Sequence, residues 1–308
     1  MLKPLREIVI FLGMTFFLSG SLYPAERIQN KVAYKNLDFP GMDNDSVKTL
    51  RKKYLTTHRN YIYKILEDGQ QYRIFVRNEL EKQKMPAILE YLPVVESEYN
   101  PYAKSRSGAT GLWQFMLNSI PGLLEYNDYV DERLDPWKST AAAMKKLNEN
   151  YSTFGDWLLA ITAYNCGAGA LKKAMKKAGS RDFWYLREKG FLSEQASGYV
   201  PKLLAIADVV ENSEYYGVSF PQARAWNGTT LETRAGMFDY VTVYDSVYLN
   251  TLSHELRIDL QELCDLNSAL IRHVTPPKKE YTLRFPEGMK DSAVYALSQM
   301  GYLTKTSN

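Results

Sequence analysis

Apolar residues recur every three or four positions along most of the chain, which is the pattern of helices with one buried face. This spacing first joins Val47, Leu50, Tyr54, Tyr61, Ile62, Ile65, Leu66, Ile74, Phe75 and Leu80. It continues in a helix that Ser139 or Thr140 can cap, and in the strongly apolar residues 157–164, which Asp156 can cap. The pattern predicts a mainly helical protein with residues 157–164 in its core.

A further helix is expected to begin at Pro86, because proline suits the first helical turn. Its apolar face holds Ile88, Tyr91, Leu92 and Val95. Glu90 is expected to point nearly opposite, whereas Glu96 and Glu98 fall near the two edges of the face. A carboxyl group half-buried beside apolar groups has a raised pKa and can donate a proton near neutrality. Spacing alone does not choose between Glu96 and Glu98, and a surface or ion-paired acid is the alternative interpretation of each.

The pattern changes after residue 211. Residues 238–243 alternate between apolar and polar side chains like a strand, and residues 281–286 form a second such segment. Between them, Leu249, Leu252 and Leu256 fall at helical spacing, and residues 259–267 continue as another helix. The order strand, helix, helix, strand predicts a small C-terminal α+β module after a linker at residues 216–236.

The N-terminal residues have the pattern of an export signal. Lys3 and Arg6 precede an apolar run at residues 8–18, and residues 19–21 (SGS) lead to a cleavage site expected after Ala25, although Tyr23 stands where a small residue is usual. We expect a signal peptide at residues 1–25, with a short uncleaved membrane anchor as the alternative. Because this segment has no cysteine, a lipid anchor is not expected. Either interpretation predicts export to the periplasm or cell envelope and leaves membrane association through this segment open.

Composition and charge exclude several classes of protein. The 308 residues are 45% hydrophobic and 24% charged, as in an ordinary folded protein. The net charge of +3 comes without a basic run, so no nucleic-acid partner is expected. Cys166 and Cys264 are far apart and are expected to be free thiols. They and the histidines lack the spacing of metal ligands, so no metal or other cofactor is expected; the histidines are His58, His254 and His273.

Seven short motifs follow one another in the middle of the chain. They are residues 96–97 (ES), 99–103 (YNPYA), 107–109 (SGA), 111–114 (GLWQ), 131–136 (DERLDP), 163–169 (AYNCGAG) and 199–203 (YVPKL). In this order they resemble the lytic transglycosylases with a goose-lysozyme-like (SLT) domain, most closely the membrane-bound lytic murein transglycosylase D type. The C-terminal module resembles a LysM-type glycan-binding module, although residues 244–246 (YDS) replace its usual glycine-aspartate turn. A small domain that only packs on the catalytic unit is the alternative.

The resemblance implies a domain order and a role for each motif residue. It implies supporting helices at residues 26–80, a lysozyme-like catalytic domain at 81–215 and a degenerate LysM-like module at 237–308. Glu96 matches the single catalytic acid of the family, and Ser97 matches a residue that orients the acid or the substrate. Four further residues match groups that line the glycan cleft: Gln114, Tyr164, Asn165 and Tyr199. Capping by Asn165 and packing by Tyr164 are the alternatives. Gly167 and Gly169 are expected to let the chain turn tightly behind the cleft.

The number of acids bears on the type of reaction. Glycoside hydrolases normally use two carboxylates at a defined separation. The other acids near the motifs are expected to be structural or solvated; they are Glu98, Glu125, Asp128 and Asp131. The resemblance implies cleavage of the MurNAc–GlcNAc β-1,4 bond of peptidoglycan with formation of a 1,6-anhydro ring. A single acid suits such intramolecular capture better than activation of water. A lysozyme-like hydrolase and a non-catalytic wall-binding protein are the alternatives. Trp113 and Tyr102 are expected either to stack on sugars or to pack.

Overall fold

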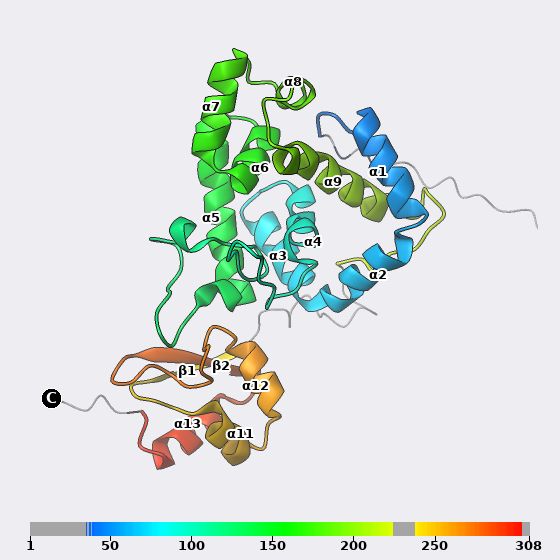
Figure 1. Ribbon diagram of the computed structural model, residues 1–308. Coiled ribbons are helices and arrows are strands. Elements are labelled where there is room, and N and C mark those ends of the chain that lie inside the picture. The colour runs from blue at the N-terminus through cyan, green and yellow to red at the C-terminus, as the bar shows by residue number, and fades with distance from the viewer. Residues whose placement is uncertain (1–34, 36, 38, 224–237, 304–308) are drawn as a thin grey trace, which may run out of the picture. The chain divides into compact units, whose positions relative to one another are not determined.

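The computed structural model describes residues 35, 37, 39–223 and 238–303 (Figure 1). The predicted signal peptide at residues 1–25 lies outside the described residues, as does most of the predicted linker. Among the described helices, none is long and apolar enough to cross a membrane. Helices dominate, with a two-stranded sheet near the C-terminus, so the predicted fold class is confirmed.

The first helices supply the support predicted for the central region. They are α1 (Asp45–Leu55), α2 (Arg59–Asp68) and α3 (Gln70–Lys82). Asn44 caps α1, since its side chain accepts a hydrogen bond from the Ser46 amide. The predicted apolar spacing is confirmed at Val47, Ile62 and Leu66, all of which are buried in the main core.

The acid-bearing segment is not one continuous helix. A 3₁₀ turn, η1 (Ala87–Tyr91), comes first and the short helix α4 (Leu92–Ser97) follows. Because a 3₁₀ turn has three residues per turn, side chains before Leu92 do not keep the register of an α-helix. The predicted outward position of Glu90 is therefore wrong: its side chain is completely buried.

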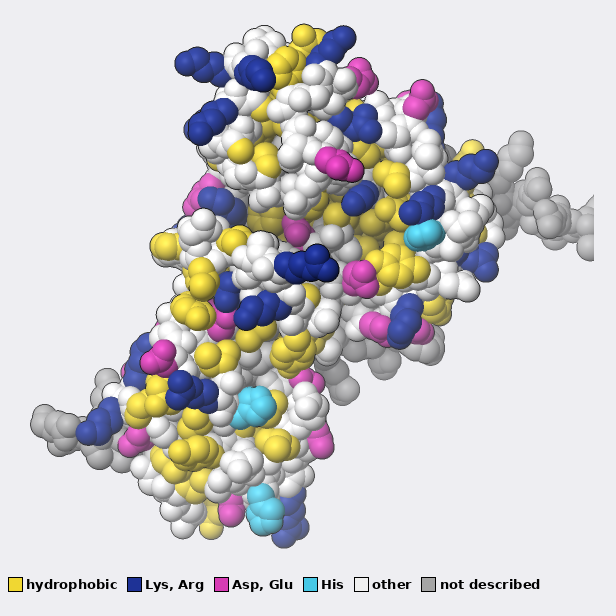
Figure 2. Space-filling model, in the orientation of Figure 1, with side chains coloured by type: hydrophobic (Ala, Val, Ile, Leu, Met, Phe, Trp, Pro, Cys, Tyr) yellow, Lys and Arg dark blue, Asp and Glu magenta, His cyan; other side chains and the backbone are white. Residues whose placement is uncertain are grey.

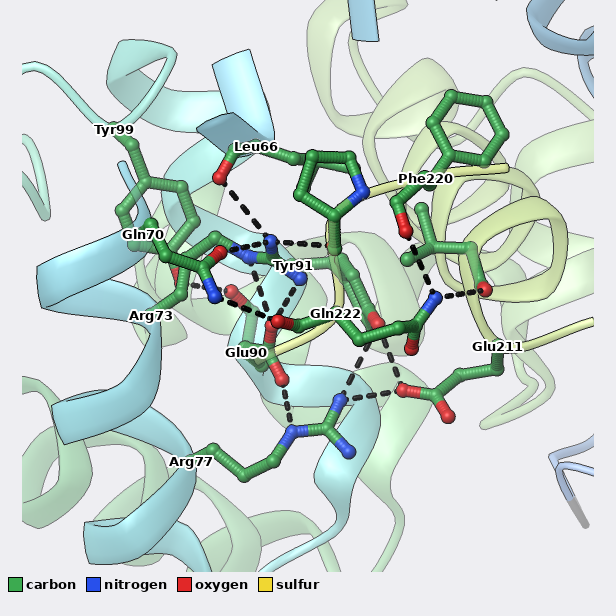
Figure 3. A network of polar contacts seen from close by, with 12 residues as sticks. Leu66, Gln70, Arg73, Arg77, Glu90, Tyr91, Tyr99, Glu211, Phe220 and Gln222 are labelled. Atoms are coloured by element: carbon green, nitrogen blue, oxygen red, sulfur yellow. Dashed lines mark hydrogen bonds and ion pairs between the residues drawn. The ribbon is translucent and has the colours of Figure 1, made fainter. Parts of the chain in front are cut away.

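A buried ionic network explains how Glu90 can lie inside the protein (Figure 3). Arg73 Nε donates to Glu90 Oε1 at 3.0 Å, and Arg77 pairs with Glu90 Oε2. Arg77 also pairs with Glu211 at the end of α9 (Glu194–Glu211), and the Tyr91 hydroxyl donates to the same carboxylate at 2.7 Å. The network joins α3, the start of the acid-bearing segment and α9 through charges that compensate one another.

The remaining helices of this region are α5 (Pro136–Phe154), α6 (Trp157–Cys166), α7 (Ala168–Ala178) and α8 (Phe183–Glu188). Asp156 caps α6 as predicted, by accepting from the Leu159 amide. The predicted caps of α5 are wrong, because Asp135 accepts from the amides of Trp137 and Lys138. Ser139 and Thr140 lie inside α5 and donate to backbone carbonyls of the preceding turn.

Helices α6 and α9 form much of the core around α4 (Figure 1). Every residue from Leu158 to Ala163 is buried, which confirms the central place predicted for this segment. Within the predicted linker, Phe220 is buried in the same core. The backbone carbonyl of Pro221 accepts a hydrogen bond of 2.8 Å from Arg73.

The C-terminal module has its own core. Strands β1 (Phe238–Val243) and β2 (Tyr281–Pro286) pair antiparallel, with Phe238 opposite Pro286. Helices α11 (Leu249–Leu256) and α12 (Leu260–Leu266) lie between them in the sequence, as predicted. A third helix, α13 (Lys290–Gln299), was not predicted; it packs against α11 and β1 and buries Ala293 and Leu297 in this core.

The module contacts the residues just before α5. Arg284 on β2 forms a buried ion pair of 3.1 Å with Asp135, the residue that caps α5. The Ser268 hydroxyl donates to the Leu134 carbonyl at 2.9 Å, and the Asp131 amide donates to the Ala269 carbonyl at 2.8 Å. Asp135 therefore both caps α5 and compensates the charge of Arg284 in the module.

Candidate active site

A cleft with a volume of about 670 Å³ opens beside the end of α4. Its lining comes from α4, α5, α6, α9 and the loop at residues 105–119. Figure 2 shows a hollow in this face, with an acidic side chain at its base. Of the predicted site residues, five line this cleft: Glu96, Gln114, Tyr164, Asn165 and Tyr199. Residues more than 100 positions apart in the sequence thus come together.

Glu96 is the only carboxylate among the described residues that line the cleft. Its side chain is half-buried, and the Tyr199 hydroxyl donates to its Oε1 at 2.5 Å. Burial raises the pKa of Glu96 to about 7, although the hydrogen bond from Tyr199 acts to lower it. A carboxyl group with this pKa is populated both with and without its proton at neutral pH, which suits a group that first donates and later accepts a proton.

Glu98 lies outside the cleft. The helical spacing alone did not distinguish it from Glu96 as the candidate acid. Glu98 follows the last residue of α4 in a left-handed conformation, with φ of 56°. Its exposed side chain contacts the Tyr61 hydroxyl. The chain reversal at the helix end therefore separates two acids that are only two positions apart.

Two tyrosines flank the Glu96 carboxylate. Burial and the nearby charge of Glu96 hold the pKa of Tyr199 and of Tyr164 well above the ordinary value, so both hydroxyls keep their protons. Tyr164 donates to the Trp113 carbonyl at 2.9 Å, and its ring packs edge-on against Phe115. Tyr164 thus both packs and lines the cleft, so the two predicted interpretations are compatible.

Gln114 holds the loop that forms one wall of the cleft. Its Nε2 donates to the carbonyls of Gly111 and Ala103, at 2.9 and 3.1 Å. A Cβ atom at Gly111 would lie 1.7 Å from the Arg133 carbonyl oxygen, so only glycine fits there. Arg133 in turn pairs with Asp131 and donates to the Phe115 carbonyl at 3.2 Å. The GLWQ and DERLDP motifs are therefore two sides of one packed turn.

The end of α6 forms another part of the wall. Asn165 lies in the last turn of the helix, and Gly167, with φ of 84°, ends it. The predicted capping role of Asn165 is wrong, because Gly167 holds the C-cap position. The predicted tight turn is confirmed at Gly167, whereas Gly169 lies inside α7. Cys166 is a free thiol that also lines the cleft.

Three predicted residues lie away from the cleft. Ser97 is buried, and its hydroxyl donates to the Leu112 carbonyl at 2.8 Å, which ties the end of α4 to the GLWQ turn. Trp113 is completely buried and donates to Thr140 Oγ1 at 2.9 Å, so of the two alternatives for this residue it is packing that the structure shows. Tyr102 is exposed, but its hydroxyl contacts Asp265 of the module, and it does not line this cleft.

Several cleft residues were not predicted. Lys146 comes from α5, while Gln195 and Lys202 come from α9. The sequence could have indicated Lys202 as a cleft residue, since it lies three positions after Tyr199 and residues at this spacing share a helix face. No such indication existed for Lys146, because α5 reaches the cleft only through the tertiary fold.

Comparisons with known proteins place two domains on the chain. A family model of the transglycosylase SLT domain matches residues 73–187, and the model "Lytic transglycosylase MltD, LysM-like domain" matches residues 237–302. Membrane-bound lytic murein transglycosylase D of Escherichia coli strain K12 is 36% identical over 202 residues. The match covers 63% of this chain and 41% of that relative, so the chain spans less than half of the relative's length.

Two further proteins are similar, one over a shorter part of the chain and the other at lower sequence identity. Peptidoglycan transglycosylase gp16 of Escherichia phage T7 is 34% identical over 124 residues, which are 39% of this chain and 9% of that protein. The crystal structure of the 70 kDa soluble lytic transglycosylase SLT70 from Escherichia coli is 19% identical, with a TM-score of 0.39, and covers 60% of this chain and 37% of that one. The two family models confirm the resemblance predicted from the sequence motifs.

Proposed function

Because this chain carries a transglycosylase SLT domain followed by an MltD-type LysM-like domain, we propose that it is a lytic transglycosylase acting on peptidoglycan. It cleaves the β-1,4 bond between MurNAc and GlcNAc and leaves 1,6-anhydro-MurNAc ends. The observation that carries this proposal is the carboxylate of Glu96, which is the only one among the described residues lining the cleft and is half-buried and hydrogen-bonded to Tyr199.

Glu96 acts first as an acid and then as a base. With a pKa of about 7, its carboxyl group donates a proton to the glycosidic oxygen as the bond to the leaving GlcNAc breaks. The resulting carboxylate then accepts the proton of the C6 hydroxyl, whose oxygen attacks C1 of the same MurNAc. The new C1–O6 bond closes the anhydro ring, Glu96 regains its proton, and no water is consumed.

The neighbouring groups orient the acid and the donor sugar. Tyr199 keeps its proton because its pKa is raised, so it remains a donor to the Glu96 carboxylate in both steps. Gln114 and Asn165 line the cleft. Gln114 offers its amide oxygen to the sugar, since its Nε2 already donates to two backbone carbonyls, and Asn165 offers its amide group. Ser97 acts indirectly, because its hydrogen bond to Leu112 fixes the end of the helix that carries the acid.

The cleft offers no partner for a two-carboxylate hydrolase. Among the described residues, Asp131 is paired with Arg133, and Glu125 is paired with Lys279. Neither lines the cleft. Capture by the substrate's own hydroxyl requires only one carboxylate, so it fits this arrangement better than activation of water.

The proposed activity also bears on where the protein acts and on what its C-terminal module binds. The substrate lies in the cell envelope, and the N-terminal segment has the pattern of an export signal, so the protein acts after export. The LysM-like module adds binding to glycan strands. Its deletion would be expected to weaken retention on sacculi while the cleft keeps its chemistry.

The test is digestion of purified sacculi followed by mass spectrometry of the fragments. Anhydro-muropeptides, 18 mass units lighter than hydrated ends, are the expected products because each ring closure forgoes one water. Hydrated reducing ends would indicate a lysozyme-like hydrolase, and retention on uncut sacculi would indicate a binding protein. Either of these two results would overturn the proposal.

A further inference from the structure

The charges that line the cleft are unequal in sign. Lys146 and Lys202 are its basic residues, and Glu96 is the only acid among the described lining residues. Glu96 is partly protonated near neutrality, so the cleft is positive on average. The sugars of the glycan chain offer hydroxyl and acetamido groups, and neutral donors and acceptors are sufficient to bind these. The two lysines therefore suit a negatively charged part of the substrate.

Lys202 is the better placed of the two. It lies three residues after Tyr199 on α9, and this spacing puts both side chains on the same face of the helix. Its side chain is exposed, and among the described residues no carboxylate lies within ion-pair distance of it. A lysine that lines a cleft without an internal carboxylate partner is free to bind an anion there.

Lys146 approaches from α5. It has one weak partner, since its Nζ lies 3.9 Å from Glu149 and both side chains are partly exposed. Exposed pairs of this kind contribute little, so the amine remains able to bind a second carboxylate. The two lysines come from different helices and together present positive charge to one cleft.

The surface next to the cleft also has a positive net charge. Residues 168–192, which follow the cleft motif AYNCGAG, contain seven basic and two acidic residues, a net charge of +5. Helix α7 alone has four exposed lysines and no acid. Figure 2 shows basic side chains gathering at the end of the molecule where α7 and α8 lie. This positive surface favours the approach of an anionic polymer.

We propose that Lys202, together with Lys146, forms a carboxylate-binding subsite for the stem peptides attached to muramic acid. This inference rests on the proposed function, since it names the part of the peptidoglycan that the cleft recognises besides the sugars. Stem peptides carry free carboxylates beside the cleaved bond, and ammonium–carboxylate hydrogen bonds are stronger than neutral ones. The preferred substrate is therefore a glycan strand whose stems are present and charged.

The experiment compares two substrates that differ only in charge. Soluble strands with intact stems are used as they are, or after conversion of their carboxylates to amides. Binding of the Glu96→Gln protein to fluorescent strands gives the dissociation constant, which requires no cleavage. Lys202→Gln should weaken binding of charged strands roughly fivefold and leave binding of amidated strands unchanged, and Lys146→Gln should do the same more weakly.

Lys145→Gln is the matched control, because Lys145 is the neighbouring exposed residue on α5 and does not line the cleft. An equal effect of Lys202→Gln on both substrates, or equal binding of both substrates by the parent protein, would overturn the inference. These outcomes are independent of the product analysis. A protein that binds charged strands through Lys202 but leaves hydrated ends would contradict the proposed reaction and not the subsite.

Discussion

The acid-bearing segment and the C-terminal module are built by different means. Residues 87–114 combine a 3₁₀ turn, a six-residue helix and left-handed backbone at Glu98, Tyr99 and Gln114. The segment is held by a buried network around Glu90. The module has two paired strands and amphipathic helices around an apolar core. Left-handed backbone also occurs in the module, at Arg257, His273 and Lys278, so the buried ionic network is what distinguishes the acid-bearing segment. Such a network is expected where a catalytic group must be held in place.

The module also differs in net charge from the helices that follow the cleft. Residues 238–303 contain six basic and nine acidic residues, a net charge of −3, whereas residues 168–192 beside the cleft have +5. The modest total of +3 hides this contrast. A net charge taken over a whole chain therefore says little about the surface that meets a substrate.

The largest effect is expected from Glu96→Gln. The variant retains the shape of the side chain and loses the proton transfers, so release of anhydro ends should fall by roughly a thousandfold or more. Initial rates of fragment release measure this, with far-ultraviolet circular dichroism as the check on folding. Glu98→Gln is the control and should remain active; comparable losses in both variants would remove the distinction between the acids.

Arg77→Met should cause the largest loss of stability. It takes one partner from the buried Glu90 carboxylate and removes the ion pair with Glu211, so the free energy of unfolding should fall by about 3 kcal/mol. Urea denaturation measures the change. Lys82→Met breaks an exposed pair with Glu79 and should cost less than about 0.5 kcal/mol. Similar values for both variants would mean that the network does not stabilise the segment.

Tyr199→Phe should have an intermediate effect. Its hydroxyl stabilises the charged form of Glu96, so its removal should raise the pKa of Glu96 above about 7. The pH profile of kcat/KM should move to higher pH on the limb that reports this group, and the maximal rate should fall roughly tenfold. An unchanged profile would show that the hydroxyl does not interact with the acid during turnover.

A smaller effect concerns stability against pH. The pKa of Glu96 in the folded protein, about 7, lies above its ordinary value of 4.5. Its contribution to stability is therefore fully present below about pH 4.5 and is lost as the pH rises through about 7. Glu96→Gln should gain stability over the parent protein between pH 5 and pH 8, by about 1 kcal/mol after allowance for partial exposure. Thermal melts across this range measure the gain, and a constant difference would contradict it.

Both strands and two of the three described helices of the module were predicted, because local pattern determines them. Alternation at residues 238–243 and 281–286 gave both strands, and their register follows from which side chains enter the core. Helix α13 was missed because its pattern is short and only Ala293 and Leu297 are buried. Asp156 was recognised as a cap from its position before an apolar run.

The acid-bearing segment was predicted only in part. The motifs identified Glu96 and its cleft partners, but the helical pattern placed Glu90 outside, and nothing in the local sequence pairs it with Arg73 and Arg77. Asp135 was missed as a cap because Pro136 and its neighbours begin the helix earlier than Ser139. Trp113 gave no sign of its burial, since an aromatic ring suits a core and a sugar surface equally.

The central claim is that the C6 hydroxyl, and not water, captures the sugar. Digestion of sacculi in water enriched in ¹⁸O, followed by mass spectrometry of the new muramic acid ends, tests it directly. The account predicts anhydro ends that carry no ¹⁸O, because the oxygen bound to C1 comes from the same sugar. Hydrated ends with one ¹⁸O at C1 would contradict it and would require a water-activating group that the described cleft does not contain.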